Sequence, residues 1–98
     1  MNDASQLAGL DLQIYSTTWC GDCRRLDRWL AEQGLQIPKV DIDLVEGAAE
    51  RLEAGTGKRG IPYFLVKGKR WVRGYHKELP QRLDTDLLLR EILEAAKA

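Results

Sequence analysis

Cysteine and histidine are scarce in this chain, and neither sign of charge predominates. Its 98 residues include two cysteines and one histidine, and 15 basic side chains balance 15 acidic ones. Scattered, balanced charge offers neither a basic groove for nucleic acid nor a basic face for a membrane surface. No apolar run approaches the length that crosses a bilayer. We therefore expect no nucleic-acid partner and no membrane association.

The two cysteines, Cys20 and Cys23, are separated by only two residues. A disulfide that closes so small a loop restrains the unfolded chain very little, so it is a poor structural staple. The segment Met1–Gln6 has no basic and no apolar region, so we expect no secretory signal. A working dithiol in a reducing cytoplasm is the more consistent setting.

Hydrophobic periodicity predicts seven elements in the order β-α-β-α-β-β-α. The expected strands are 12–16, 37–44, 63–66 and 70–75. The first expected helix begins at residue 20 or 21, the second runs over 46–54, and the third begins between 80 and 85. Gly34 is placed to end the first helix, and Gly55 and Gly57 to end the second. A turn at Gly68-Lys69 joins the last two strands.

This order predicts an α/β fold in one domain over residues 1–98, with a four-stranded mixed sheet and helices on both faces. The first two strands are joined by a helix, so they should be parallel with a right-handed crossover. The last two are joined by a tight turn and should be antiparallel. The junction after the first strand then lies where open α/β sheets bind their ligands.

Cys20 and Cys23 fall at this junction, and a C-x-x-C at a strand-to-helix junction is typical of a thioredoxin-like redox motif. Unpaired N–H groups and the helix dipole at a helix start would stabilise a thiolate at Cys20. Arg24 and Arg25 add positive charge, whereas Asp22 opposes them. We expect Cys20 to be the nucleophile and Cys23, one turn further on and nearer the core, to resolve the mixed disulfide.

The segment 14–26, which contains Cys20-Gly21-Asp22-Cys23, resembles the active-site segment of glutaredoxin-like proteins, mycoredoxins included. Residues 40–43 look like the second strand of that family. Gly60-Ile61-Pro62 stands where the family has Thr-Val-Pro with a cis proline. The resemblance implies a thioredoxin-like (glutaredoxin) fold and a thiol–disulfide oxidoreductase.

The resemblance also implies a substrate site around the dithiol. The backbone of Ile61 would face the cysteines and pair with an extended substrate by strand addition. The implied substrate-binding residues are Thr17, Thr18, Trp19, Gly60, Ile61, Pro62 and Gly74. Further candidates are Asp22, Lys58, Arg59 and Tyr75. Of these, Lys58 and Arg59 could meet a substrate carboxylate, and Trp19 is expected to flank the sulfur of Cys20.

Two positions depart from glutaredoxins that bind glutathione. Those proteins often have a lysine three residues before the first cysteine, where this chain has Thr17, and Gly-Gly-x-Asp after the last strand, where it has one glycine, Gly74. The segment Trp71–Tyr75 resembles Trp-Ser-Gly-Phe of NrdH-type redoxins, which take electrons from thioredoxin reductase. The electron donor is therefore open between a glutathione-like small thiol and thioredoxin reductase.

The expected partners are a disulfide-bearing protein and this donor, acting on a monomer with no bound cofactor beyond its redox-active Cys20–Cys23 disulfide. Plainer alternatives remain. The dithiol could be buried and inert, or the chain could be a carrier that binds a metal or iron–sulfur cluster through Cys20 without disulfide turnover. A zinc site is disfavoured because His76, expected in an exposed loop, is the sole further cysteine or histidine. Trp71 and Tyr75 could be packing residues or a docking patch.

Overall fold

The computed structural model describes residues 4–97. Its elements are a 3-10 helix η1 (Ala4–Leu7), β1 (Leu12–Ser16), α1 (Gly21–Glu32), β2 (Lys39–Asp41), α2 (Ala48–Thr56), β3 (Tyr63–Val66), β4 (Arg70–Arg73) and α3 (Thr85–Lys97). The predicted order is confirmed, and η1 is an addition that the sequence pattern did not indicate. The start of the segment Met1–Gln6 and the expected helix end at Ala98 lie outside the described residues. Within residues 4–97, no helix is long and apolar enough to cross a membrane.

The four strands form one mixed sheet in the order β2-β1-β3-β4. Strand β1 is parallel to β2 and antiparallel to β3, and β3 is antiparallel to β4. Tyr15 lies opposite Val40 on one side and Tyr63 on the other. The predicted parallel and antiparallel pairings are therefore confirmed, and β1 occupies the interior of the sheet, where both of its edges are paired.

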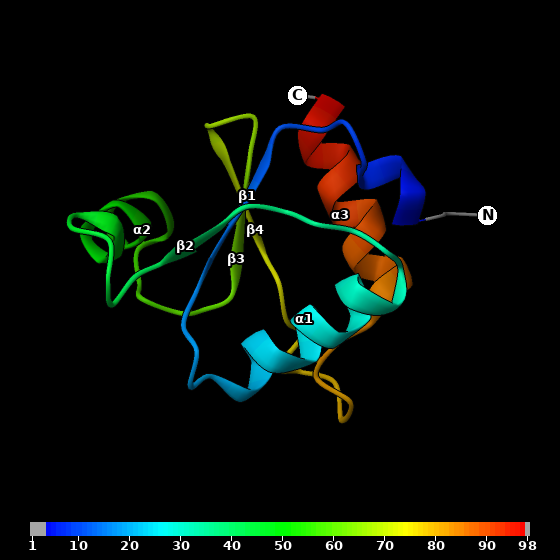
Figure 1. Ribbon diagram of the computed structural model, residues 1–98, viewed down its shortest axis with the longest axis horizontal. Coiled ribbons are helices and arrows are strands. Elements are labelled where there is room, and N and C mark those ends of the chain that lie inside the picture. The colour runs from blue at the N-terminus through cyan, green and yellow to red at the C-terminus, as the bar shows by residue number, and fades with distance from the viewer. Residues whose placement is uncertain (1–3, 98) are drawn as a thin grey trace.

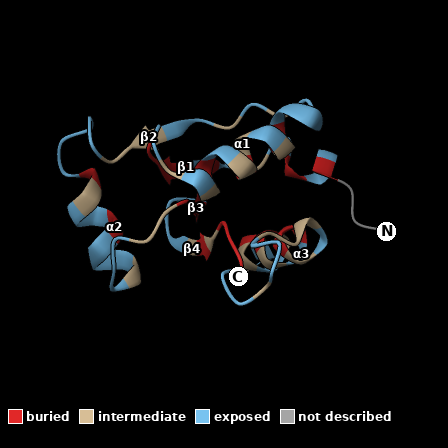
Figure 2. Cartoon of the chain, turned by 90° about the horizontal axis from the view of Figure 1, so that it is seen from below, coloured by how far each residue is buried: buried red, intermediate tan, exposed pale blue. Residues whose placement is uncertain are grey.

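Helices cover both faces of the sheet, as Figure 1 shows with α2 on one side and α1 and α3 on the other. Alternate residues of the strands point to opposite faces, so Ile14 and Phe64 join the larger core under α1 and α3. Tyr15 and Leu65 join the smaller core under α2. Figure 2 shows the buried residues concentrated on the strands and on the inward sides of the helices.

Strand β2 is shorter than the expected 37–44. The side chain of Asp41 accepts a hydrogen bond from the Asp43 backbone N–H at 2.9 Å. The Asp41 carbonyl also accepts from the N–H groups of Leu44 and Val45, at 3.1 and 2.9 Å. This local turn ends the strand and leaves Leu44 and Val45 exposed.

Helix α2 lies two residues later than the expected 46–54. It starts after Gly47 and ends at Gly57, both of which have positive φ. Gly55 does not end the helix. A Cβ there would lie 2.0 Å from Trp71 Nε1, so the glycine lets the indole pack on the helix. Trp71 also meets the Tyr15 ring edge-on with centroids 4.9 Å apart, which makes it a packing residue.

The connections around the last strand and helix also differ slightly from expectation. The hairpin turn is centred on Lys67 and Gly68, one residue earlier than predicted, and both have positive φ. Strand β4 ends at Arg73 rather than at residue 75. Helix α3 starts at the latest residue of the predicted range, because Asp84 Oδ1 accepts from the Leu87 N–H at 3.0 Å and caps the helix.

Candidate active site

The two cysteines lie at the N-terminal end of α1, just beyond the carboxyl end of β1. Cys20 is the N-cap residue in extended conformation, and the Cys23 N–H donates to Cys20 Sγ at 3.3 Å. A sulfur in this position receives an unpaired helix N–H and lies at the positive end of the helix dipole. The Cys20 sulfur is therefore placed at the positively polarised start of α1.

The two sulfurs differ in exposure. Both cysteines are free thiols; Cys20 is half-buried, and Cys23 is buried beneath it. Burial, followed by the hydrogen bond with the Cys20 thiol, raises the pKa of Cys23 to about 12. The Thr17 backbone acts in the opposite direction and lowers that pKa. Cys23 therefore keeps its proton at neutral pH, and Cys20 is the sulfur that a substrate can reach.

A loop before β3 faces the dithiol. The Ile61–Pro62 peptide bond is cis, which confirms what the resemblance implies. The Cys20 thiol donates to the Ile61 carbonyl across 3.9 Å, so the Ile61 backbone lies opposite the sulfur. The Gly74 N–H donates to the Pro62 carbonyl at 2.9 Å. A Cβ at Gly74, the residue after β4, would lie 3.2 Å from both Pro62 Cγ and Pro62 O, so a side chain there would push the cis-proline loop away by a few tenths of an ångström.

Tyr75 and Gly60 support the same loop. Tyr75 is buried, and a Cβ at Gly60 would lie 2.8 Å from its hydroxyl oxygen. The Arg73 guanidinium lies over the Tyr75 ring, 5.2 Å from its centroid. Tyr75 is thus buried against the cis-proline loop, and its role as a docking residue stays a prediction.

Asp22, between the cysteines, is bound by two arginines. Arg82 donates to its two carboxylate oxygens at 2.9 and 2.6 Å, and Arg25 donates at 2.5 Å. The hydrogen bond from Arg82 is the main reason that the pKa of Asp22 is lowered. The sequence pattern does not predict the Asp22–Arg82 ion pair. Arg82 lies in a loop 60 residues after Asp22, and no local spacing indicates that the two side chains meet.

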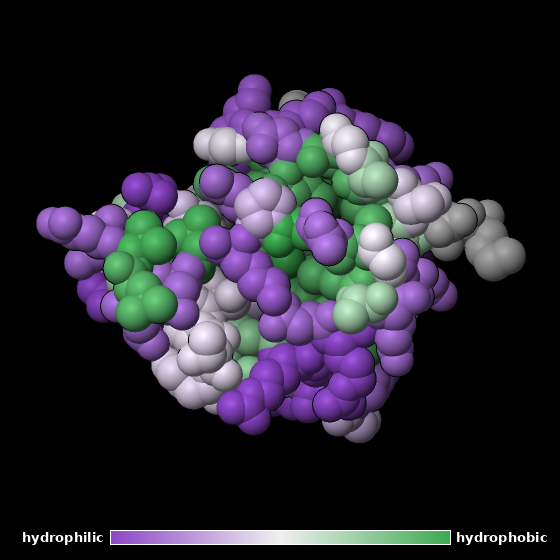
Figure 3. Space-filling view, viewed as in Figure 1, coloured by the Kyte–Doolittle hydropathy of each residue, from purple (hydrophilic) through white to green (hydrophobic). Residues whose placement is uncertain are grey.

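Trp19 stands on the outer side of the site. Its side chain is 65% exposed, and Nε1 donates to Asp43 Oδ2 at 2.7 Å. Between Trp19 and α2 lies an open groove of about 570 Å³. Its lining is Trp19, Ile42, Asp43, Leu44, Val45, Glu46, Gly47, Ala49, Glu50, Arg59 and Ile61. Figure 3 shows apolar surface on the side where Figure 1 places the β2–α2 connection.

The other predicted site residues have different surroundings. Thr17 is buried, and among residues 4–97 its Oγ1 finds no hydrogen-bond partner. The exposed Thr18 accepts from Arg24 Nε at 3.4 Å through its carbonyl. Lys58 is exposed, and Arg59 pairs with Glu53 at 3.6 Å. Both basic side chains lie on the surface near the cis-proline loop, and Arg59 also lines the groove.

His76 corrects an expectation, because it is buried rather than exposed, with 1% of its surface accessible. Nδ1 accepts from the Asp84 N–H at 3.1 Å, which places the proton of the neutral ring on Nε2. Nε2 lies 2.9 Å from Glu91 Oε1. The histidine therefore fastens the loop before α3 to that helix.

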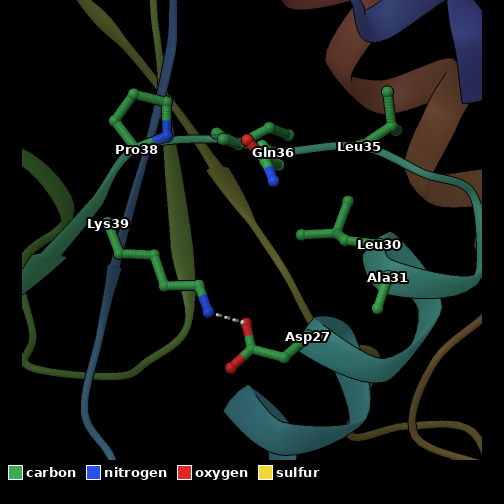
Figure 4. Close-up of a pocket in the computed structure, with 8 residues that line it drawn as sticks. Asp27, Leu30, Ala31, Leu35, Gln36, Pro38 and Lys39 are labelled. Carbon is green, nitrogen blue, oxygen red and sulfur yellow. Dashed lines mark ion pairs between the residues drawn. The ribbon is translucent and has the colours of Figure 1, made fainter.

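A second hollow, of about 500 Å³, lies beside the C-terminal half of α1 and is shown in Figure 4. It is lined mostly by apolar side chains, with Gln36 and the 2.7 Å Lys39–Asp27 ion pair as its polar members, and neither cysteine lines it. In the described part of the chain, no group of three or more His, Cys, Asp and Glu side chains could hold a metal ion. A cluster bridged by one Cys20 from each of two chains is a different arrangement and stays untested.

The fold and this site define a thioredoxin-fold protein with an accessible dithiol. The Glutaredoxin family model matches residues 12–71, more than half of the chain. Glutaredoxin-C4, chloroplastic, of Oryza sativa subsp. japonica is 32% identical over 66 residues, 64% of this chain and 50% of that protein. The Glutaredoxin-like protein NrdH of Salmonella typhimurium is 28% identical over 74 residues, 76% of this chain and 89% of that protein.

The crystal structure of a buckwheat glutaredoxin-glutathione complex has a TM-score of 0.59 to this chain, with 24% identity, over 97% of this chain and 87% of that structure. This likeness confirms the fold. The chain spans about half the length of the rice relative and most of the Salmonella one. The chain belongs to the glutaredoxin family.

Proposed function

We propose that this chain is a thiol–disulfide oxidoreductase that works through the dithiol of Cys20 and Cys23. The observation that supports this best is the asymmetry of the pair. Cys20 is accessible, receives a helix N–H at 3.3 Å and faces the Ile61 carbonyl at 3.9 Å. Cys23 is buried one turn behind it with a raised pKa. This arrangement suits one sulfur for attack and the other for resolution.

The reaction proceeds in two exchanges. The Cys20 thiolate attacks one sulfur of the substrate disulfide, the substrate S–S bond breaks, and the departing thiolate takes up a proton. Cys23 then loses its proton and attacks Cys20 Sγ, which releases the second substrate thiol and forms the Cys20–Cys23 disulfide. The substrate gains two electrons and two protons, and the dithiol loses them. A thiol or dithiol donor reduces the protein again.

A trapping experiment tests this division of roles. Cys23→Ser should accumulate a mixed disulfide between Cys20 and a protein substrate, because the resolving sulfur is gone. It should keep turnover on mixed disulfides of small thiols, which a second small thiol resolves. Cys20→Ser should form no adduct and show no turnover. Adducts at Cys23 in the Cys20→Ser variant would show that Cys20 is not the attacking sulfur.

We further propose that protein disulfides, rather than glutathione mixed disulfides, are the main substrates. The groove beside Trp19 is apolar at Leu44 and Val45 and suits a side chain next to the reacting cysteine of a peptide. Its three acidic members, Asp43, Glu46 and Glu50, outnumber its one basic member, Arg59, so the groove disfavours the carboxylates of glutathione. Thr17 replaces the lysine that would attract them.

The groove can be tested with two substrates. Leu44→Ser should lower kcat/KM for a basic peptide disulfide with an apolar residue beside cysteine by about threefold to tenfold, because an apolar contact is lost. It should leave reduction of hydroxyethyl disulfide unchanged, since that molecule is too small to reach the groove. Equal losses on both substrates would show that the substitution disturbs the dithiol rather than the groove.

A protein that holds a cluster through Cys20 would behave differently. Its purified form would show a visible absorption band that disappears in Cys20→Ser, and it would turn over no disulfide. That result would replace the proposal of an oxidoreductase.

A further inference from the structure

The carboxylate of Asp22 lies in the first turn of α1, between the attacking and resolving cysteines, and 13% of its side chain is exposed. Arg82 engages it with two parallel hydrogen bonds, Nε to Oδ1 at 2.9 Å and Nη2 to Oδ2 at 2.6 Å. Arg82 also interacts electrostatically with Cys20. Such a two-pronged pair fixes the carboxylate in place and offsets its charge.

Arg82 occupies this position in a strained backbone conformation. Its φ is +61°, in the left-handed region that glycine adopts far more readily. The Arg82 carbonyl accepts from the His76 N–H at 2.6 Å, and the Arg82 N–H donates to the Leu79 carbonyl at 3.1 Å. This strained conformation, together with the two hydrogen bonds to Asp22, points to a role for the Arg82 side chain.

Other charged groups around the dithiol are engaged elsewhere or lie at the surface. On α1, Arg24 donates to the Thr18 carbonyl, and Arg25 shares Asp22 with Arg82. On the β2–α2 connection, Asp43 accepts from Trp19.

The charged groups on the cis-proline side of the dithiol are also paired elsewhere or exposed. Arg59 pairs with Glu53, whereas Lys58 is exposed. At the end of β4, Arg73 pairs with Glu78. Asp22 is therefore the acidic group placed within the dithiol motif itself, and Arg82 is its bidentate partner.

We propose that Arg82 is a positioning residue for thiol–disulfide exchange, which holds and neutralises the Asp22 carboxylate so that it does not repel the Cys20 thiolate. An uncompensated carboxylate beside a thiol disfavours the thiolate, and the thiolate is the attacking species. The inference rests on the proposed function, since it assigns Cys20 as the attacking sulfur. It makes the loop between β4 and α3 a part of the site.

The test measures the reactivity of Cys20 without any disulfide turnover. In a Cys23→Ser background, Cys20 is the single remaining cysteine. Its alkylation by iodoacetamide, in which the thiolate displaces iodide, is followed from pH 5 to pH 10. Arg82→Gly should move the midpoint of this pH profile upward and slow alkylation at pH 7 by about threefold to tenfold.

Two controls separate charge compensation from structure. Lys67 also has a positive φ, in the hairpin turn away from the site. Lys67→Gly therefore removes the same kind of backbone strain and should leave the pH profile of Cys20 alkylation unchanged. Arg82→Gly removes backbone strain and should not unfold the protein. Thermal unfolding checks that the slower alkylation occurs in a folded protein. Arg82→Lys, which keeps the charge but loses the two-pronged geometry, should fall between wild type and Arg82→Gly.

Removing the charge of the Asp22 carboxylate tests whether Arg82 acts on Cys20 through Asp22. If Arg82 acts mainly through Asp22, then Asp22→Asn should remove most of the effect of Arg82→Gly, and the small remaining difference reports the direct charge interaction of Arg82 with Cys20. An unchanged profile in Arg82→Gly would overturn the proposal, and so would an equal slowing in the Asp22→Asn background. Failure of disulfide turnover with the predicted alkylation profile would instead overturn the proposed function.

Discussion

At the scale of single residues, the difference between Cys20 and Cys23 lies in their surroundings. Cys20 is the N-cap of α1 and faces the Ile61 carbonyl, whereas Cys23 has 1% of its surface exposed. Burial disfavours the charged form of a thiol, so the inner sulfur ionises only at high pH. Under the proposed mechanism, these two environments suit one thiol for attack and the other for resolution.

The raised pKa of Cys23 predicts a stability change at alkaline pH in the reduced protein. Its pKa rises from an ordinary 9.0 to about 12, so the unfolded chain loses this proton at lower pH than the folded one. Stability should be fully present below pH 9 and fall above it, with a slope of up to about 1.4 kcal/mol per pH unit from this group.

The measurement is urea unfolding of the reduced protein from pH 8 to pH 10.5, compared with Cys23→Ala. Burial also raises the pKa of Tyr63, which acts in the same direction, so the difference between the two proteins isolates Cys23. Parallel stability curves for the two proteins would show that Cys23 ionises alike in both states.

The sequence predicts the position of the two cysteines in the fold, because both belong to one local motif at the junction of β1 and α1. It does not predict the Asp22–Arg82 pair, since this depends on a loop whose conformation includes a positive φ at an arginine. The burial of His76 escapes prediction for a similar reason. Its partners, the Asp84 N–H and Glu91, are supplied by the start of the following helix.

At the scale of elements, strand and helix cores follow the hydrophobic pattern, whereas their ends follow local hydrogen bonds. Strand β3 lies where the pattern predicts it, because four consecutive buried residues bounded by turns leave little choice. Strand β2 ends early because Asp41 forms its own turn. Helix α2 passes Gly55 because a tertiary contact with Trp71, invisible in local sequence, accounts for that glycine.

The cap of α3 gives a prediction at this scale. Asp84→Ala removes the acceptor for the Leu87 N–H and should destabilise the protein by about 0.5–2 kcal/mol. Asp84→Asn should retain most of the stability, because an amide oxygen also accepts. The exposed Asp86, one residue inside the helix, provides the matched control, and Asp86→Ala should cost less. Equal losses in chemical denaturation for Asp84→Ala and Asp86→Ala would contradict the capping role.

The close contact between the end of β4 and the cis-proline loop gives a second prediction at this scale. Gly74→Ala forces a Cβ to within 3.2 Å of Pro62 and 3.3 Å of Leu26, so it should cost about 1–3 kcal/mol and impair turnover. Gly21→Ala, in the first turn of α1, meets open space and should not lower stability. Thermal unfolding of both variants checks this, and a Gly74→Ala protein as stable as wild type would show that the loop shifts without cost.

At the scale of the whole molecule, the topology brings the parts of the site together. The junction from β1 to α1 supplies the dithiol, and the loop before β3 supplies the cis proline. The adjacent pairing of β1 with β3 holds the two side by side. Helix α2 and the turn before it form the outer wall of the groove on the same side. A single domain over residues 1–98, a monomeric state and a cytoplasmic location stay predictions.

The electron donor is a property of the whole surface around the dithiol. Because the lysine and the Gly-Gly-x-Asp pattern are absent and the groove carries acidic residues, we expect thioredoxin reductase to reduce the oxidised protein faster than glutathione with its reductase. NADPH consumption in the two coupled assays measures this directly. Faster reduction by glutathione would place the chain with glutathione-dependent glutaredoxins despite Thr17.

The account as a whole depends on Cys20 and Cys23 exchanging electrons with a substrate disulfide as a pair. The most direct measurement is mass spectrometry of the fully reduced protein after one equivalent of a peptide disulfide is added. We predict a protein lighter by two hydrogen atoms, with a Cys20–Cys23 crosslink in its digest and one equivalent of reduced peptide. An unchanged protein mass beside intact peptide disulfide would contradict the central claim.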